Sequence, residues 1–173
     1  HLPADDQLTL KVAAVIGQQF SIDEMAAIHP DRNDPGALRT ELDDLLDHQL
    51  VTREGSEYIF THALTRDAAY GRLLYSQKAL LHAQLAEWYG AAQDTTLIGQ
   101  LAHHWESSWL AAREIDRPPV DLDHVKAEAA DSLEKATDAA LASGLPHESL
   151  ELGLRATRIL GVALPSTAEE VGL

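Results

Sequence analysis

The stretch that decides the fold is LVTREGSEYIFTHALTRDAAYGRLL, residues 50–74. Two short runs rich in strand-forming residues, 50–53 and 57–60, flank the turn Glu54-Gly55-Ser56, and this arrangement predicts a β-hairpin. From residue 63 onward the pattern is almost entirely that of helices. His62 therefore lies where the hairpin passes into a helix. The question it raises is whether this histidine binds a ligand or only packs in the junction.

Three helices are predicted before the hairpin. The first has the i, i+4, i+7, i+8 spacing of a helix with one buried face, with Asp5 or Asp6 as its cap. Ser21 and Glu24 have the capping-box spacing and predict a short second helix to about His29, after which HPDRNDPG (29–36) reads as a loop. The apolar positions are Leu8, Val12, Val15 and Ile16 in the first helix and Leu38, Leu42, Leu45 and Leu46 in the third. Three helices followed by a hairpin is the element order of a winged helix.

The remainder is predicted to be helical, with apolar stripes at Leu81, Leu85, Trp88 and Tyr89 and at Ile98, Leu101, Ala102, Trp105 and Trp109. Residues 110–124 break the pattern with Pro118-Pro119 and acidic residues, so they predict a loop. Two further helices, at about 123–143 and 147–161, are joined by SGLP. The stretch 140–160 resembles a tetratricopeptide-type helical hairpin, in which small residues let helices approach closely. The predicted organisation is a winged-helix domain (1–62), a helical connector (63–110) and the start of a tetratricopeptide-like region (111–173).

Composition narrows the function classes. The 173 residues contain no cysteine and carry a net charge of −15, so disulfides and thiolate metal sites are excluded. No apolar run approaches the ~18 residues that span a bilayer, and we expect no membrane partner and a cytoplasmic location. Nucleic-acid binding is not expected either, because an acidic surface repels phosphates. The third helix, which would be the DNA reader, carries only Arg39 against Glu41, Asp43, Asp44 and Asp47.

A family resemblance rests on three strings: LTLKVAAVIGQQFS (8–21), the segment from LDDLLDHQL to LAEWYG (42–90), and LAHHW (101–105). Within them, F-x-H-A-L-x-R-D-x-A-Y (60–70) followed by Leu81-His82 is the most specific set. Together they resemble the segment that follows the ATPase module in bacterial STAND-type signalling ATPases, over residues 7–110. That resemblance implies a piece of a longer regulator in which an AAA-like module precedes a winged helix and tetratricopeptide repeats, many being fused to class III adenylate/guanylate cyclases.

The resemblance also implies roles for residues. In related proteins a histidine at the end of the winged helix contacts the ADP β-phosphate and stabilises the closed state. His62 occupies the matching position in this sequence. The next residue is Ala63, whereas immune receptors of the class have aspartate there. ATP or ADP with Mg would be the cofactor of the full-length protein. Arg66 and Asp67 would contact the upstream ATPase module of the same chain. The structural alternative is that His62 packs the junction and that Arg66 and Asp67 form a solvated surface pair.

No catalytic residue is expected in these 173 residues, because the sequence has neither a G-x-x-x-x-G-K-[ST] phosphate loop nor a G-x-S-x-G elbow. The full-length protein would be an ATPase and, if cyclase-linked, a nucleotidyl cyclase. His103-His104 is not expected to bind metal, since neighbouring residues on a helix point about 100° apart. Two alternatives stay open: part of a LuxR/MalT-type transcription activator, with a basic helix-turn-helix beyond the C-terminus, or a scaffold that binds a protein partner through its helical repeats.

Overall fold

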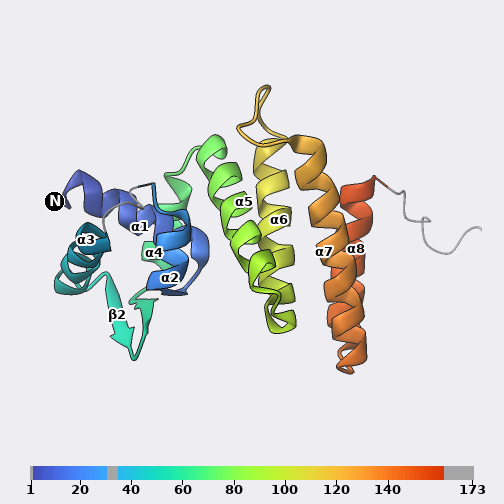
Figure 1. Cartoon of the computed structure of the whole chain (residues 1–173), viewed down its shortest axis with the longest axis horizontal. Helices are drawn as coiled ribbons and strands as arrows, with labels where there is room; N and C mark the ends of the chain where they lie inside the picture. The colour runs from blue at the N-terminus through green and yellow to red at the C-terminus, as the bar shows by residue number, and fades with distance from the viewer. Residues whose placement is uncertain (1, 31–34, 162–173) are drawn as a thin grey trace, which may run out of the picture.

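The fold, in a computed structural model that describes residues 2–30 and 35–161, is mainly helical with one small antiparallel sheet (Figure 1). Part of the predicted loop 29–36 and the last residues of the predicted third region, 162–173, lie outside the described residues. The first half comprises α1 (Ala4–Ile16), β1 (Gln19–Ser21), α2 (Ile22–Ile28), α3 (Pro35–Asp47), β2 (Val51–Glu54), β3 (Glu57–Phe60) and α4 (Ala63–Gly71). The second comprises α5 (Tyr75–Ala92), the 3₁₀ turn η1 (Thr95–Leu97), α6 (Ile98–Ala112), α7 (Leu122–Ala142) and α8 (Pro146–Leu160).

The first half is built on α1, which packs against both α3 and α4. The stripes predicted for the first and third helices are confirmed: Val12, Val15, Leu42 and Leu45 are buried, and Leu8 and Leu46 pack at the edge of the same core. Burying one such side chain contributes about 1.5–3 kcal/mol, so these stripes are the main force that brings the helices together.

The hairpin forms as predicted, and the sheet gains a strand that the sequence did not indicate. β2 and β3 pair antiparallel around Gly55, whose φ of 63° is the left-handed conformation that a tight hairpin turn needs. β1 pairs with the other edge of β3, so the strand order is β1-β3-β2. Phe20 of β1 is fully buried and stacks on Tyr58, with ring centroids 5.6 Å apart. The sheet thus closes one side of the core.

The predicted N-terminal cap is found at α2 but not at α1. The capping box of α2 is confirmed: Glu24 N–H donates to Ser21 Oγ at 3.2 Å, and Ser21 N–H donates to the Glu24 carboxylate at 2.7 Å. The predicted cap of the first helix is wrong, because α1 begins at Ala4 and both Asp5 and Asp6 lie inside its first turn. There the exposed Asp5 carboxylate favours the helix through its dipole rather than by capping it, whereas Asp6 is buried and burial raises its pKa.

The second half is a row of helices that run up and down, each packed on the next (Figure 1). The connection 113–121 and the turn containing Gly144 lie where the sequence placed them. Of the tryptophans on the predicted apolar stripes, Trp105 is buried in the core, whereas Trp88 is 37% exposed and is not a core residue. Small residues dominate the contacts among α6, α7 and α8, including Ala102, Ala129 and Ala156. Small side chains at these positions let neighbouring helices pack closely.

Helix α5 joins the two halves because its opposite faces belong to different cores. Leu81, Leu85 and Tyr89 pack into the core of the first half. Ala83 and Ala86 instead pack into the second core, with α6 and α7. A helix that is buried on two faces has little amphipathic character, so periodicity alone assigns it to neither half.

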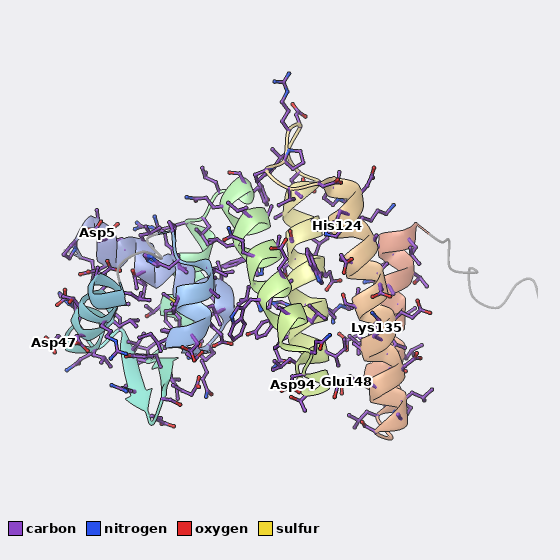
Figure 2. The ribbon with its side chains drawn as sticks, viewed as in Figure 1. Asp5, Asp47, Asp94, His124, Lys135 and Glu148 are labelled. Atoms are coloured by element: carbon purple, nitrogen blue, oxygen red, sulfur yellow. The ribbon has the colours of Figure 1, made fainter. Side chains whose placement is uncertain are left out.

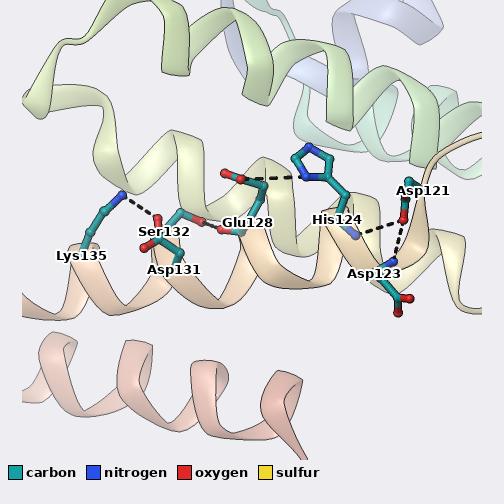
Figure 3. A network of polar contacts seen from close by, with 7 residues as sticks. All are labelled: Asp121, Asp123, His124, Glu128, Asp131, Ser132 and Lys135. Carbon is teal, nitrogen blue, oxygen red and sulfur yellow. Dashed lines mark hydrogen bonds and ion pairs between the residues drawn. The ribbon is translucent and has the colours of Figure 1, made fainter.

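Charged side chains cover the outside of both halves (Figure 2), among them Asp5, Asp47, Asp94 and Glu148. Along the solvent face of α7 the side chains pair locally (Figure 3): Asp121 accepts the backbone N–H groups of Asp123 and His124, and Lys135 pairs with Asp131. Within residues 2–30 and 35–161, none of the helices has the length and apolar character that crossing a membrane requires.

Candidate functional site

His62 is the first residue of interest, and it lies at the N-cap of α4, two residues after β3. Its backbone carbonyl accepts the Thr65 N–H at 3.0 Å and the Arg66 N–H at 3.4 Å, which starts the helix. Its side chain makes no capping bond and is exposed. The backbone of His62 therefore forms the junction, while the imidazole is left available to a neighbouring molecule or domain.

Arg66 and Asp67 lie one turn further along α4 and pair with each other. Arg66 Nη2 and Nε donate to the same oxygen, Oδ1 of Asp67, at 2.7 and 3.0 Å. Asp67 is exposed and Arg66 is half-buried, so the pair stays in contact with solvent and contributes under about 1 kcal/mol to stability. The fold brings the three residues singled out in the sequence onto one short exposed helix, but it joins only Arg66 and Asp67 by direct contact.

A buried pair of histidines, which the sequence analysis did not identify, lies behind α4 at the crossing of α5 and α6. His82 and His104 are each 1% exposed, and their Nδ1 atoms are 2.8 Å apart. The other ring nitrogen of His82, Nε2, lies 2.9 Å from the hydroxyl of Tyr70 on α4. Three helices thus meet through one chain of hydrogen bonds: α4 through Tyr70, α5 through His82 and α6 through His104.

Both imidazoles are neutral at physiological pH. Burial lowers the pKa of His82 well below the ordinary value, and the neighbouring His104 and His103 lower it further. Burial also lowers the pKa of His104 to about 3, with a contribution from His103. In the Nδ1···Nδ1 bond one nitrogen carries the hydrogen and the other accepts it. A proton added to the accepting nitrogen removes the bond, so the pair is an acid-sensitive contact.

The same chain of contacts reaches the N-terminal helices through Tyr89. Its ring stacks on His104 with centroids 5.6 Å apart, and its hydroxyl donates to the carboxylate of Glu24 on α2. Burial and this hydrogen bond raise the pKa of Tyr89 far above the ordinary tyrosine value, so the hydroxyl keeps its proton. Glu24 therefore both caps its own helix and holds α2 against α5.

A second buried polar cluster joins α1, α2 and α3. Thr9 Oγ1 lies 2.9 Å from His29 Nε2 and donates to the carboxylate of Glu41. Hydroxyl, imidazole and carboxylate are the groups of a hydrolytic triad, but here the hydroxyl contacts both partners and Thr9 is fully buried. No substrate atom can reach that oxygen, so the cluster serves to hold the three helices together.

The histidine pair does not have the geometry of a metal site. Two imidazole nitrogens on one tetrahedral zinc ion lie about 3.3 Å apart, given Zn–N bonds of about 2.0–2.1 Å, whereas 2.8 Å between the His82 and His104 nitrogens is a hydrogen-bond distance. His103 is exposed, and its ring meets that of His104 edge-on with centroids 4.9 Å apart. In the described part of the chain no three histidine, aspartate or glutamate side chains converge as ligands.

A cavity of about 470 Å³ opens between α6, α7 and α8. Its polar lining includes Gln100, His103 and Arg155, and its apolar side is formed by alanines of α7. The charge of Arg155 is already engaged, because its Nε donates to the Glu106 carboxylate at 3.0 Å. That pair joins α6 to α8 and leaves the cavity without a free cation from this residue.

The sequence could not reveal the histidine pair, because its members are 22 residues apart on different helices. One signal was present: His82 lies next to Leu81 within a stripe of buried positions, where a polar side chain needs a partner. Comparisons of the chain with family models, with curated proteins and with solved structures found no match.

Proposed function

We propose that this chain is the non-catalytic transmission segment of a larger STAND-type signalling ATPase. In this proposal residues 1–62 form a winged helix that packs on a nucleotide-binding module preceding it in the same protein. The observation that carries the proposal is the exposed imidazole of His62, held at the start of α4 without a side-chain capping bond. A donor left open to solvent at a rigid strand–helix junction is well placed to meet a phosphate held by another module.

The character of α3 supports a protein contact over a DNA contact for this half of the chain. Among its exposed side chains, Arg39 is outnumbered by Asp43 and Asp47. A helix with this balance is repelled by DNA phosphates and offers few donors to base edges. The surface is better suited to a protein partner.

The proposed mechanism is a nucleotide-dependent change of state. With ADP and Mg in the preceding module, the His62 N–H donates to the β-phosphate and the two modules stay packed together. Exchange for ATP, or a ligand on the helical repeats, favours the separated state, in which that bond is absent. Helix α4 follows His62 directly and is tied to α5 and α6 through Tyr70 and His82, so a displacement of the junction is passed to the repeats. An adenylate or guanylate cyclase is the effector that we propose.

The test is His62→Ala in the intact protein, with ADP affinity measured by calorimetry and the output of the effector measured without stimulus. Loss of a hydrogen bond to a charged group costs about 1.5–3 kcal/mol, so ADP should bind roughly ten- to hundredfold more weakly and basal output should rise. His147→Ala, at an exposed histidine on α8, is the matched control and should leave both unchanged. Unchanged ADP affinity together with unchanged output in the His62 variant would reject the mechanism.

A second candidate function is a scaffold that binds a protein partner through its helical repeats. It is favoured by the exposed leucines of α7 and α8, of which Leu141 is 62% and Leu150 is 63% exposed. The coding sequence around this chain separates the candidates. A Walker A motif upstream supports the ATPase, its absence supports the scaffold, and a basic helix-turn-helix downstream supports a LuxR/MalT-type activator.

A further inference from the structure

A shallow apolar groove runs between α1 and α4, on a surface that His62 does not line. It has a volume of about 370 Å³. Leu64 stands at its edge with 80% of its surface exposed, the largest value among the exposed large apolar side chains of the described residues. The groove is lined by Gln7, Leu10, Lys11, Leu64, Thr65, Ala68, Ala69 and Arg72.

The charge of this groove is opposite to that of the chain. Lys11 and Arg72 are its two charged lining residues among those described, and no carboxylate joins them, although the chain contains 28 Asp and Glu. Neither cation forms an ion pair with a residue in the described ranges. An apolar groove flanked by two unpaired cations is complementary to an apolar surface that carries carboxylates.

Such a surface is present at the turn between α7 and α8. Leu141, Leu145 and Leu150 are 62%, 48% and 63% exposed within ten residues of one another. The segment 138–151 contains Asp138, Glu148 and Glu151 and no Lys or Arg. We call this segment the acidic turn. Single exposed leucines need no explanation, but three around one turn are typical of a contact surface.

The groove and the acidic turn cannot meet within one molecule. α1 and α4 lie at one end of the row of elements and α7 and α8 at the other (Figure 1). The side-chain view separates them in the same way, with Glu148 on α8 far from Asp5 on α1 (Figure 2). A contact between the two surfaces therefore needs a second copy of the chain.

We propose that the chain self-associates head to tail, with the acidic turn of one copy seated in the α1–α4 groove of the next. Leu64 packs against the leucines of the turn, and Lys11 and Arg72 pair with its carboxylates. The two surfaces differ, so the contact is heterologous and continues into a ring or a filament rather than stopping at a symmetric dimer. The groove is small, so the contact belongs to the weak, reversible class.

Sedimentation velocity of the whole 173-residue chain, from about 1 to 200 µM at low and high salt, tests the proposal. The wild type should form species larger than a dimer as concentration rises, and about 0.5 M NaCl should weaken this association by tenfold or more. Two variants each remove one half of the contact by introducing uncharged side chains: Leu64→Gln with Arg72→Gln in the groove, and Leu150→Gln with Glu148→Gln in the turn. All four side chains are on the surface, so circular dichroism should show unchanged helix content in both variants.

Mixing the two variants is the decisive experiment. Each should be monomeric alone, because each retains only one of the two surfaces. The groove variant keeps an intact acidic turn and the turn variant keeps an intact groove, so each could still supply one half of a contact. The mixture should therefore form a one-to-one dimer and nothing larger. Wild-type protein that stays monomeric at every concentration would overturn the proposal. A mixture that stays monomeric while the wild type associates would also overturn it. So would self-association of both variants on their own. A wild type that stops at a dimer would show a symmetric contact and would also reject it.

Discussion

Acid should destabilise this protein through the buried pair His82 and His104, and replacing His104 with phenylalanine should make stability less dependent on pH. In the unfolded chain each histidine takes up a proton near pH 6.5. In the folded chain burial lowers both pKa values, that of His104 to about 3. Between those limits the unfolded state binds more protons than the folded state. The free energy of unfolding therefore falls as pH falls below about 6.5.

The magnitude follows from the size of that window. Each histidine that stays neutral in the folded state costs about 1.4 kcal/mol of stability for each pH unit below 6.5. From pH 6.5 to 4.5 the loss is about 2.3 kcal/mol for His104, because the unfolded histidine is already half protonated at pH 6.5. His82 adds a loss in the same direction. A domain of this size is stable by about 5–15 kcal/mol in total, so His104 alone removes a substantial share of it.

The assay is urea unfolding followed by circular dichroism at several pH values from about 7.5 to 4.5. His104→Phe keeps a ring that can stack on Tyr89 but removes one titrating group. It should be less stable than the wild type at neutral pH, by about 1–3 kcal/mol, because His82 loses its partner. Between pH 6.5 and 4.5 its stability should fall by about 2.3 kcal/mol less than that of the wild type.

Carboxylates also titrate in this range, but they are common to both proteins and cancel in the difference. His147→Phe, at an exposed position, should follow the wild-type curve. Equal losses of stability in the wild type and in His104→Phe would refute the reasoning, because they would show that His104 takes up its proton equally easily in the folded and unfolded states.

Four further substitutions test the packing and the backbone geometry. Leu85→Ala should cost about 2–5 kcal/mol in urea unfolding, because Leu85 is fully buried in the core of the first half. Gly55→Ala should lower the free energy of unfolding by about 1 kcal/mol because φ is 63° there. Gly99→Ala should raise it by up to about 1 kcal/mol, because Gly99 lies in a helix with free space around it. The reverse order of the two melting temperatures would contradict the turn geometry. Tyr89→Phe should cost about 1–3 kcal/mol, since Glu24 loses its donor, and no loss in thermal unfolding would mean that water replaces the hydroxyl.

Local features of the fold could be predicted from the sequence because they depend on neighbours in the chain. The capping box at Ser21 and Glu24 and the hairpin at Gly55 each need only a few adjacent residues. The leucine stripe of α3 identified its buried face for the same reason. Strand β1 could not be predicted, because three residues are too few to show the alternation of a strand, and it exists only through its pairing with β3.

Contacts between helices could not be predicted from the sequence. The register of α5 against α6 decides that His82 meets His104, and neither helix alone contains that information. Trp88 fitted the apolar stripe of its own helix, yet the neighbouring elements leave it partly uncovered. The position of His62 between strand and helix was predicted correctly. The exposure of its ring could not be predicted, because it depends on how α4 packs against α1.

Because α5 contributes buried side chains to both cores, the chain cannot be cut on either side of α5 without exposing one of them. A chain that ended at residue 74 would lose Leu81, Leu85 and Tyr89 and leave the first core open on one side. A chain that began after α5 would expose the alanine-lined faces of α6 and α7. Any truncation that preserves either half should therefore keep α5, because each core loses buried side chains without it.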